Sequence, residues 1–260
     1  ISLWRLEESA GPMAYDSLNG RDGNYVGGVG YGQPGFTSGD LSVNFPNSGW
    51  ETEPPSTYVE VPYSATLNPS GAFSIEFWTK ISSVPNDLFS PLAALDMNAG
   101  RSGYLFYLNG GSGWQFRMGN AAGAYVATVA GGTTTTDWQH IVGVYDGAGN
   151  ASLYVNGIQY GPVALSGAFN PNATQPLRIG APTGLARPWN GLVDEVAFYD
   201  HALTPAQVMK HTMAGTPLRI SIAPATDIVA NAAPASGPVN GQNFGATWLA
   251  SDAGRQGVMN

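Results

Sequence analysis

Apolar residues recur along this chain in short runs with alternating polar positions, and turn-forming residues separate the runs. A period of two predicts β-strands with one buried face, and many such strands at close spacing indicate an all-β sandwich. The pattern lacks the helix between successive strands that a parallel α/β sheet requires. The predicted strands are Ser2–Leu6, Leu41–Phe45, Tyr58–Val61, Phe73–Ile81, Leu88–Leu95, Tyr104–Leu108, Trp114–Met118, Tyr125–Val129, Trp138–Tyr145, Ser152–Val155, Ile158–Tyr160, Leu177–Gly180 and Gly191–Tyr199.

The clearest turn is an Asn-Gly pair at 156–157, which separates two of these apolar runs. Asn-Gly supplies the positive φ angles that a two-residue hairpin turn requires. We therefore expect a hairpin in which Val155 lies opposite Ile158 and Leu153 lies opposite Tyr160.

A second hairpin is predicted around the Gly-rich turn centred on Gly111. Its core face would hold three cross-strand pairs, Leu108–Trp114, Phe106–Phe116 and Tyr104–Met118. The opposite face would carry Leu105, Tyr107, Gln115 and Arg117. That second face is either ordinary solvated surface or the floor of a polar binding cleft.

One short helix is predicted late in the chain. Thr204-Pro205-Ala206-Gln207 has the form of a capping box, with Thr204 as N-cap and proline at the first helical position. Gly215 is expected to end the helix.

Residues 216–260 are rich in Ala, Pro, Asn and Gly and too poor in apolar residues for a core of their own. The chain is thus expected to hold one domain, 1–215, and an extended tail, 216–260, that is a linker or the truncated start of a following module.

Charge and cysteine content exclude several classes of partner and binding site. The 260 residues carry 10 basic and 18 acidic side chains, a net charge of −8, and no cysteine. The acidic balance argues against nucleic acid as a partner, and the absence of cysteine excludes disulfides and thiolate metal sites. No apolar run approaches the ~20 residues of a membrane span, so no membrane insertion is expected. The low charge and high Gly, Thr, Asn and Pro content favour a secreted or cell-surface bacterial protein.

Four motifs occur in series along the chain. They are Phe73-Ser-Ile-Glu-Phe-Trp-Thr-Lys, Asp137-Trp-Gln-His-Ile-Val-Gly-Val-Tyr-Asp, Ser152-Leu-Tyr-Val-Asn-Gly and Gly191-Leu-Val-Asp-Glu-Val-Ala-Phe-Tyr-Asp-His-Ala-Leu-Thr. Together these motifs resemble the laminin-G-like family of the concanavalin A-like lectin/glucanase superfamily. The resemblance covers roughly 1–215 and implies a jelly roll of two curved antiparallel sheets. It implies ligands on the concave face or at the loop rim. It implies no particular activity, because this scaffold serves lectins, interaction modules and glycan-cleaving enzymes.

The sequence lacks the residue spacings that retaining glucanases and polysaccharide lyases require. A retaining glucanase needs two carboxylates about 5 Å apart on one strand face, whereas the adjacent Asp194 and Glu195 are expected to point to opposite faces. A polysaccharide lyase would need a cluster around an acidic sugar, for which Gln139, His140, Arg117 and Tyr145 supply residue types without the spacing. We therefore expect no enzymatic activity, with a lyase or glycoside hydrolase as the more distant alternative.

A calcium ion is expected as a structural cofactor. The segment 16–24 is rich in the Asp, Asn and Gly that calcium-binding loops use, although an ordinary Asx turn has the same composition. The resemblance further implies a calcium ligand at Asp194, on the last core strand, facing an early loop. The expected ligands are Asp194, Asp16, Asn19, Asp22 and Asn24.

Carbohydrate recognition is the expected function. A sugar site combines aromatic rings for the apolar sugar face with polar side chains for the hydroxyls. We expect Trp78, Trp114 and Trp138, which lie in strand patterns, in the core. The predicted site has a floor and a rim, formed by Tyr107, Gln115, Arg117, Arg101, Trp50 and Trp189. The alternative is a protein-interaction or structural spacer module of a multidomain surface protein, and in either case further domains of the same chain are expected.

Overall fold

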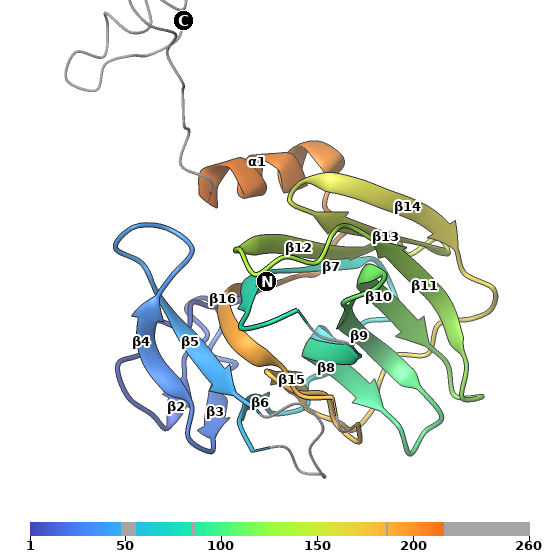
Figure 1. Ribbon diagram of the computed structural model, residues 1–260. Helices are drawn as coiled ribbons and strands as arrows, with labels where there is room; N and C mark the ends of the chain where they lie inside the picture. The colour runs from blue at the N-terminus through green and yellow to red at the C-terminus, as the bar shows by residue number, and fades with distance from the viewer. Residues whose placement is uncertain (48–55, 85–86, 186, 216–260) are drawn as a thin grey trace, which may run out of the picture. The chain divides into compact units, whose positions relative to one another are not determined.

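Two antiparallel sheets of eight strands each form the domain (Figure 1). The computed structural model describes residues 1–47, 56–84, 87–185 and 187–215. In the first sheet the order is β14 (Ile158–Ala164), β13 (Asn150–Val155), β12 (Gln139–Tyr145), β7 (Phe73–Ile81), β16 (Asn190–Tyr199), β5 (Leu41–Pro46) and β4 (Gly30–Pro34), and β1 (Ser2–Trp4) also pairs with β16. In the second it is β11 (Tyr125–Gly131), β10 (Gly113–Gly119), β9 (Ser102–Asn109), β8 (Leu88–Asp96), β15 (Leu177–Ile179), β6 (Tyr58–Val61), β3 (Gly23–Val26) and β2 (Met13–Ala14).

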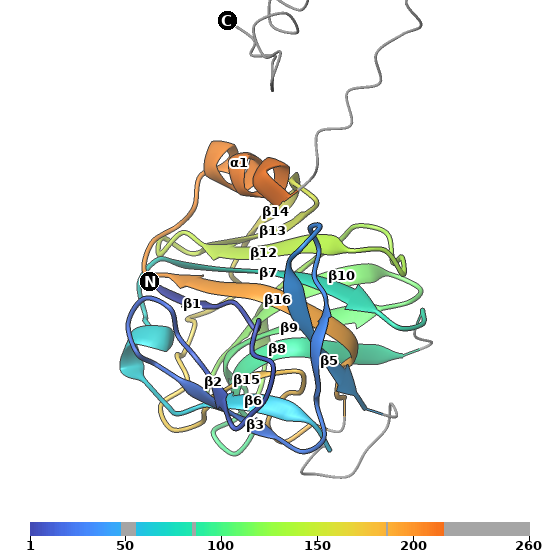
Figure 2. The same ribbon diagram turned by 90° about the vertical axis from the view of Figure 1, so that its left-hand side faces the viewer.

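The core lies between the two sheets, where alternate residues of each strand meet (Figure 2). Phe77 of β7 meets Phe106 of β9 edge to face, with ring centroids 5.0 Å apart. Phe106 also stacks on Phe116 of β10 at 4.9 Å. The all-β, antiparallel sandwich is therefore confirmed, and Phe77, Phe106 and Phe116 face inward as the alternation predicts.

Both predicted hairpins form in the expected register. Val155 pairs with Ile158 and Leu153 with Tyr160 across the Asn-Gly turn. The other hairpin has the three predicted cross-strand pairs, Leu108–Trp114, Phe106–Phe116 and Tyr104–Met118. These registers decide which side chains of β9 and β10 face away from the core, and they thereby place the candidate site.

The sequence pattern missed three strands, β2, β3 and β4. They are 2, 4 and 5 residues long. β4 reads Gly-Tyr-Gly-Gln-Pro, and its pairing with β5 is irregular between Gly30 and Gln33. Strands of this kind carry no apolar alternation, so their pairing with longer neighbours defines them. A short 3-10 helix, η1 (Ala65–Leu67), follows β6.

The predicted helix is α1 (Pro205–Gly215), which lies over the outer face of the first sheet (Figures 1 and 2). The capping box is present: the Gln207 N–H donates to Thr204 Oγ1, and the Thr204 N–H donates to Gln207 Oε1. Val208 of the helix packs with Val142 and Tyr154 in an apolar cluster separate from the core. Within the described ranges, no helix is long and apolar enough to cross a membrane. The predicted tail 216–260 lies outside the described residues, so its boundary stays a prediction.

Candidate functional site

The predicted ligand-binding hairpin face forms a pocket on the outer face of the second sheet. Residues of β8 and β9 alternate between the core and a small outer cluster, which holds Ala93, Leu95, Leu105 and Tyr107. Small-molecule sites measure roughly 300–1,000 Å³, and this one, at about 340 Å³, lies at the lower end of that range. Its lining residues are Leu88, Met97, Arg101, Tyr107, Arg117, Tyr125, Gly184, Leu185 and Arg187, and we call it the arginine pocket.

Two tyrosines and two arginines are layered in this pocket. The Arg117 guanidinium lies 5.0 Å from the ring centroids of both Tyr107 and Tyr125. Arg101 lies 4.6 Å from the Tyr125 ring. Gln115 Oε1 accepts hydrogen bonds from Nε and Nη2 of Arg117, the former at 2.9 Å. Burial raises the pKa of Tyr107 far above its usual range, so its hydroxyl stays protonated. The pocket thus offers aromatic faces and fixed hydrogen-bond donors together.

A loop after β15 forms one wall of the arginine pocket. The Ser90 N–H of β8 donates to the Arg187 carbonyl at 2.9 Å, and Pro188 forms a parallel bridge with Ser90. These bonds hold Leu185 and Arg187 beside the Tyr107 face. The wall is therefore fixed to the sheet by main-chain bonds.

The structure brings together Tyr107, Arg117 and Arg101, three of the six predicted binding residues. Gln115 is 8% exposed and acts by holding Arg117. Trp189 was expected at the rim, and this placement is wrong: its side chain is fully buried and its ring lies 5.6 Å from that of Trp114. Trp50 lies outside the described residues.

Tyr125 and Arg187 also line the pocket, and neither was predicted. The β10–β11 register shifts between Met118 and Gly119, so Tyr125 pairs with Gly119 and cannot be placed by simple alternation. Arg187 comes from a loop about 70 residues along the chain from Arg117, and no local pattern connects them. Because these contacts depend on a bulge and on a long connection, neither residue could be placed from the sequence pattern.

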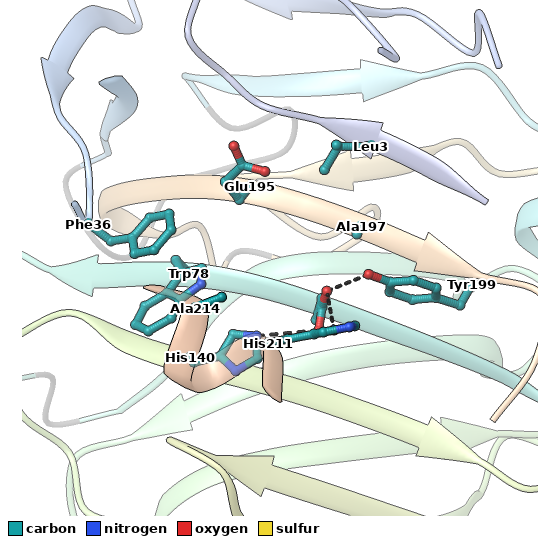
Figure 3. Close-up of a pocket in the computed structure, with 10 residues that line it drawn as sticks. Leu3, Phe36, Trp78, His140, Glu195, Ala197, Tyr199, His211 and Ala214 are labelled. Carbon is teal, nitrogen blue, oxygen red and sulfur yellow. Dashed lines mark hydrogen bonds and ion pairs between the residues drawn. The ribbon is translucent and has the colours of Figure 1, made fainter. Parts of the chain in front are cut away.

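A second pocket, of about 290 Å³, lies on the outer face of the first sheet beside α1, and we call it the α1 pocket (Figure 3). Phe36 stacks on Trp78 with centroids 4.3 Å apart, and Trp78 stacks on His140 at 4.9 Å. Figure 3 shows Phe36 at one side of this pocket and Tyr199 at the other. Trp78 was expected in the core but is buried on this outer face. Trp138, also expected in the core, is only half-buried.

Glu76 of β7 is the polar centre of the α1 pocket. Its carboxylate accepts hydrogen bonds from the Tyr199 hydroxyl at 2.5 Å and pairs with His211 Nδ1 at 3.0 Å. His140 Nε2 lies 3.4 Å away. Burial raises the pKa of Glu76, but the hydrogen bonds from His140, His211 and Tyr199 outweigh it and hold the pKa at about 2. The carboxylate therefore stays ionised and tethers α1, which carries His211, to the sheet.

The tether makes stability depend on pH. Its hydrogen bond to Glu76 raises the pKa of His211 above 6.5. The charged pair therefore stabilises the fold fully below about pH 6.5, and this contribution disappears as pH rises through the raised pKa. Because the His211 side chain is 33% exposed, we expect a difference below about 1 kcal/mol. Urea unfolding from pH 5 to 9 should show wild type and His211→Gln converging at high pH, and parallel curves would contradict this.

A β-bulge in β16 changes the placement of Asp194 and Glu195. Val193 and Val196 both point into the core, so the two residues between them share the outer face. The register with β7 shifts between Asp194 and Ala197, and Glu195 has a φ of 46°. The expectation that Asp194 and Glu195 point to opposite faces is therefore wrong, because the bulge adds one residue to the strand.

The bulge places these carboxylates in an acidic cluster. Carboxylate oxygens of Glu7, Asp40 and Glu195 lie within 4.8 Å of one another. Asp194 is fully buried beside them; its Oδ2 accepts from the Phe36 N–H at 3.2 Å, while its Oδ1 has no hydrogen-bond partner among the described residues. Burial and the neighbouring Asp40 raise the pKa of Asp194 to about 9.

The pKa of Glu195 is raised in the same acidic cluster. Burial raises its pKa to about 7, although Arg5, whose Nη1 lies 3.2 Å from Glu195 Oε1, lowers it. Arg5 offsets only part of the cost of holding four carboxyl groups together, one of them with an unpartnered buried oxygen. Oxygen ligands at this spacing suit calcium, which binds six to eight oxygens at about 2.3–2.6 Å. The donor set fits that ion.

The other predicted calcium ligands lie in a different setting. Asp16 Oδ1 accepts from the backbone N–H groups of Leu3 and Leu18, and Asp22 Oδ1 accepts from the Asp16 N–H. The bond from Leu18 forms the Asx turn that was the alternative for this segment, and the other two bonds fasten it to its neighbours. Among the described acidic and histidine side chains, the group able to share one ion contains neither Asp16 nor Asp22. Asn19 and Asn24, expected as ligands with them, belong to this same early segment.

The residues considered for a lyase are not brought together. Gln139 faces the core, where its Oε1 accepts from Trp114 Nε1 at 3.0 Å. His140 lies on the outer face of the first sheet, in the α1 pocket. Arg117 lies on the outer face of the second sheet. Tyr145, the fourth residue considered, faces the core. The four side chains are therefore spread over different layers of the sandwich.

A family model described as the concanavalin A-like lectin/glucanases superfamily, Laminin_G_3, matches residues 53–209. The chain belongs to this superfamily. The laminin-G-like resemblance seen in the strand motifs is thereby confirmed, together with the jelly-roll sandwich that it implied. A search of curated proteins found no match.

Solved structures share the laminin-G-like fold at low sequence identity. A structure titled for botulinum neurotoxin type C and its interaction with two ganglioside molecules has 12% identity and a TM-score of 0.63, covering 84% of this chain and 51% of that one. The binding domain of Paraclostridial Mosquitocidal Protein 1 has 16% identity and a TM-score of 0.61, covering 82% and 51%. Trypanosoma rangeli sialidase with 2,3-difluorosialic acid has 17% identity and a TM-score of 0.60, covering 82% and 32%. The chain thus spans about a third to a half of these proteins.

Proposed function

We propose that this chain is a non-catalytic carbohydrate-binding module of a secreted or cell-surface protein, and that it holds a polysaccharide in the arginine pocket. The observation that carries the proposal is the meeting of Tyr107, Tyr125, Arg101 and Arg117 around one cavity. Aromatic rings pack against the apolar faces of sugars, and planar guanidinium groups donate to their oxygens. A similar fold in a neurotoxin structure titled for ganglioside interaction supports a carbohydrate ligand.

A Tyr125→Ala variant should lose at least tenfold in glycan affinity, because it removes a pocket wall and the ring on which both arginines rest. The purified wild type is first screened on a glycan array and by affinity electrophoresis in polysaccharide gels. Tyr63→Ala is the matched control, since Tyr63 is 42% exposed and is not among the residues that line the pocket. Retention on no glycan would contradict the proposal and favour a protein-interaction module; cleavage of any glycan would contradict the non-catalytic part.

We propose further that calcium binds at the acidic cluster with Asp194, and serves the fold rather than chemistry. Glu7, Asp40 and Glu195 come from three separate segments, so an ion there would join them. Phe36 of the α1 pocket is held by Asp194 through its backbone N–H. Calcium binding would therefore fix the loop that follows β4.

A further inference from the structure

We propose that the arginine pocket recognises an anionic substituent, a carboxylate or sulfate group, on its saccharide. This inference rests on the proposed carbohydrate-binding function and specifies the class of sugar. Three of the described residues that line the pocket are arginines, and none of those described residues is acidic. The chain as a whole has 18 acidic against 10 basic residues, so a cavity lined by three of those basic side chains departs from its overall charge.

The charges of Arg101 and Arg117 are not neutralised by carboxylates. Among the described residues, no ion pair joins either side chain to an aspartate or glutamate. Asp87 lies 3.9 Å from Nε of Arg187, and this is a separate contact with that arginine alone. Half-buried guanidinium groups without a counter-ion raise the local potential, and an arriving anion would neutralise it.

Arg117 is held in a fixed orientation. Gln115 Oε1 accepts from Nε and Nη2, and the flat guanidinium lies 5.0 Å from the rings of Tyr107 and Tyr125. Because Gln115 occupies the Nε and Nη2 edge, Nη1 is the nitrogen left without a hydrogen bond among the described residues. A glutamine at this position orients the cation without cancelling its charge. That arrangement suits a ligand that brings the negative charge itself.

Arg101 supplies a second donor group beside the same ring. It lies 4.6 Å from the Tyr125 centroid, and no side-chain hydrogen bond is recorded for its guanidinium among the described residues. Leu88, Met97 and Leu185 provide apolar walls that lower the local dielectric. A charge pair formed there is stronger than one on the open surface. Two arginines on one tyrosine therefore form a site for a group with at least two anionic oxygens.

The test uses a glycan array that carries neutral, uronic-acid-containing, sialylated and sulfated glycans. We expect the glycans that bind to be anionic, and the carboxylated and sulfated spots to separate the two sources of charge. Binding only to neutral glycans would overturn this inference and leave the carbohydrate-binding function standing. Binding to no glycan at all would contradict both. The two failures are thus distinguishable on one array.

Variants then test the arginines themselves, with the best-binding anionic glycan as titrant in calorimetry. Arg101→Gln and Arg117→Gln should each lower affinity at least tenfold and reduce its salt dependence. Arg101→Lys should restore part of the affinity, because it restores the charge without the planar fork. Lys80→Gln is the control, since it removes the same charge from β7 of the other sheet. Unchanged affinity in both folded arginine variants would overturn the inference.

Discussion

Calcium should raise the midpoint of thermal unfolding by about 5–10 °C, and an Asp194→Asn substitution should abolish that rise. A ligand that binds only the folded state adds about 2.7 kcal/mol when its free concentration is about a hundredfold above Kd. In a domain of this size, 1 kcal/mol corresponds to about 2–4 °C. The expected rise follows because calcium would join the carboxylates of Glu7, Asp40 and Glu195, whose mutual repulsion the single charge of Arg5 offsets only in part. Differential scanning calorimetry with EDTA and with calcium measures it.

The Asp194→Asn variant distinguishes an effect on calcium binding from an effect on packing. Asp194 is fully buried with an unpartnered Oδ1, so a neutral amide of the same shape should leave the calcium-free protein at least as stable as wild type. Asp16→Asn is the discriminating control, because Asp16 belongs to the early segment that composition alone had favoured as the calcium loop. The control should keep the calcium response. A response lost in Asp16→Asn and kept in Asp194→Asn would reverse this assignment of ligands.

The strand pattern was sufficient to predict most of the sandwich. Each of the thirteen predicted strands has a counterpart, because buried alternating runs such as 73–81 leave only one face that can enter the core. β4 could not be predicted, since its Gly-Tyr-Gly-Gln-Pro sequence follows neither period and its conformation is imposed by β5. Alternation thus identifies strands that bury their own side chains, and it misses strands that only complete an edge.

The predicted part of the candidate site consists of two residues that follow from a hairpin register and of Arg101, which precedes that hairpin. Tyr107 and Arg117 could be placed because the symmetric pairing about Gly111 fixes which side chains leave the core. Trp189 was misplaced because a tryptophan in a Gly/Pro-rich loop carries no periodic signal, and here the loop folds inward onto Trp114. The shared outer face of Asp194 and Glu195 depends on one inserted residue. Bulges and loop closures are set by tertiary contacts, so single-sequence patterns do not reveal them.

Replacing Phe106 with alanine should destabilise the domain by about 3–5 kcal/mol, a large share of the about 5–15 kcal/mol that holds such a domain together. Phe106 has no exposed surface and packs on both Phe77 and Phe116, so its removal leaves a cavity between the sheets. Urea denaturation measures the change. Ile158→Ala is the control, because Ile158 is 60% exposed, and it should cost less than about 0.5 kcal/mol.

Gly143 of β12 lies close to the Phe106 ring, and a larger residue there tests how tightly the two sheets pack. A Cβ at Gly143 would lie 2.6 Å from Cζ of Phe106 and 2.9 Å from Cδ2 of Phe116, so Gly143→Ala should cost about 1–3 kcal/mol through crowding. Phe106→Leu removes the ring atoms that cause most of this crowding. The double variant should therefore be more stable than the sum of the two single changes by at least about 0.5 kcal/mol. Additive costs in this cycle would mean that the rings of β9 and β10 yield to the new methyl group without strain, and that packing here is less tight than the distances imply.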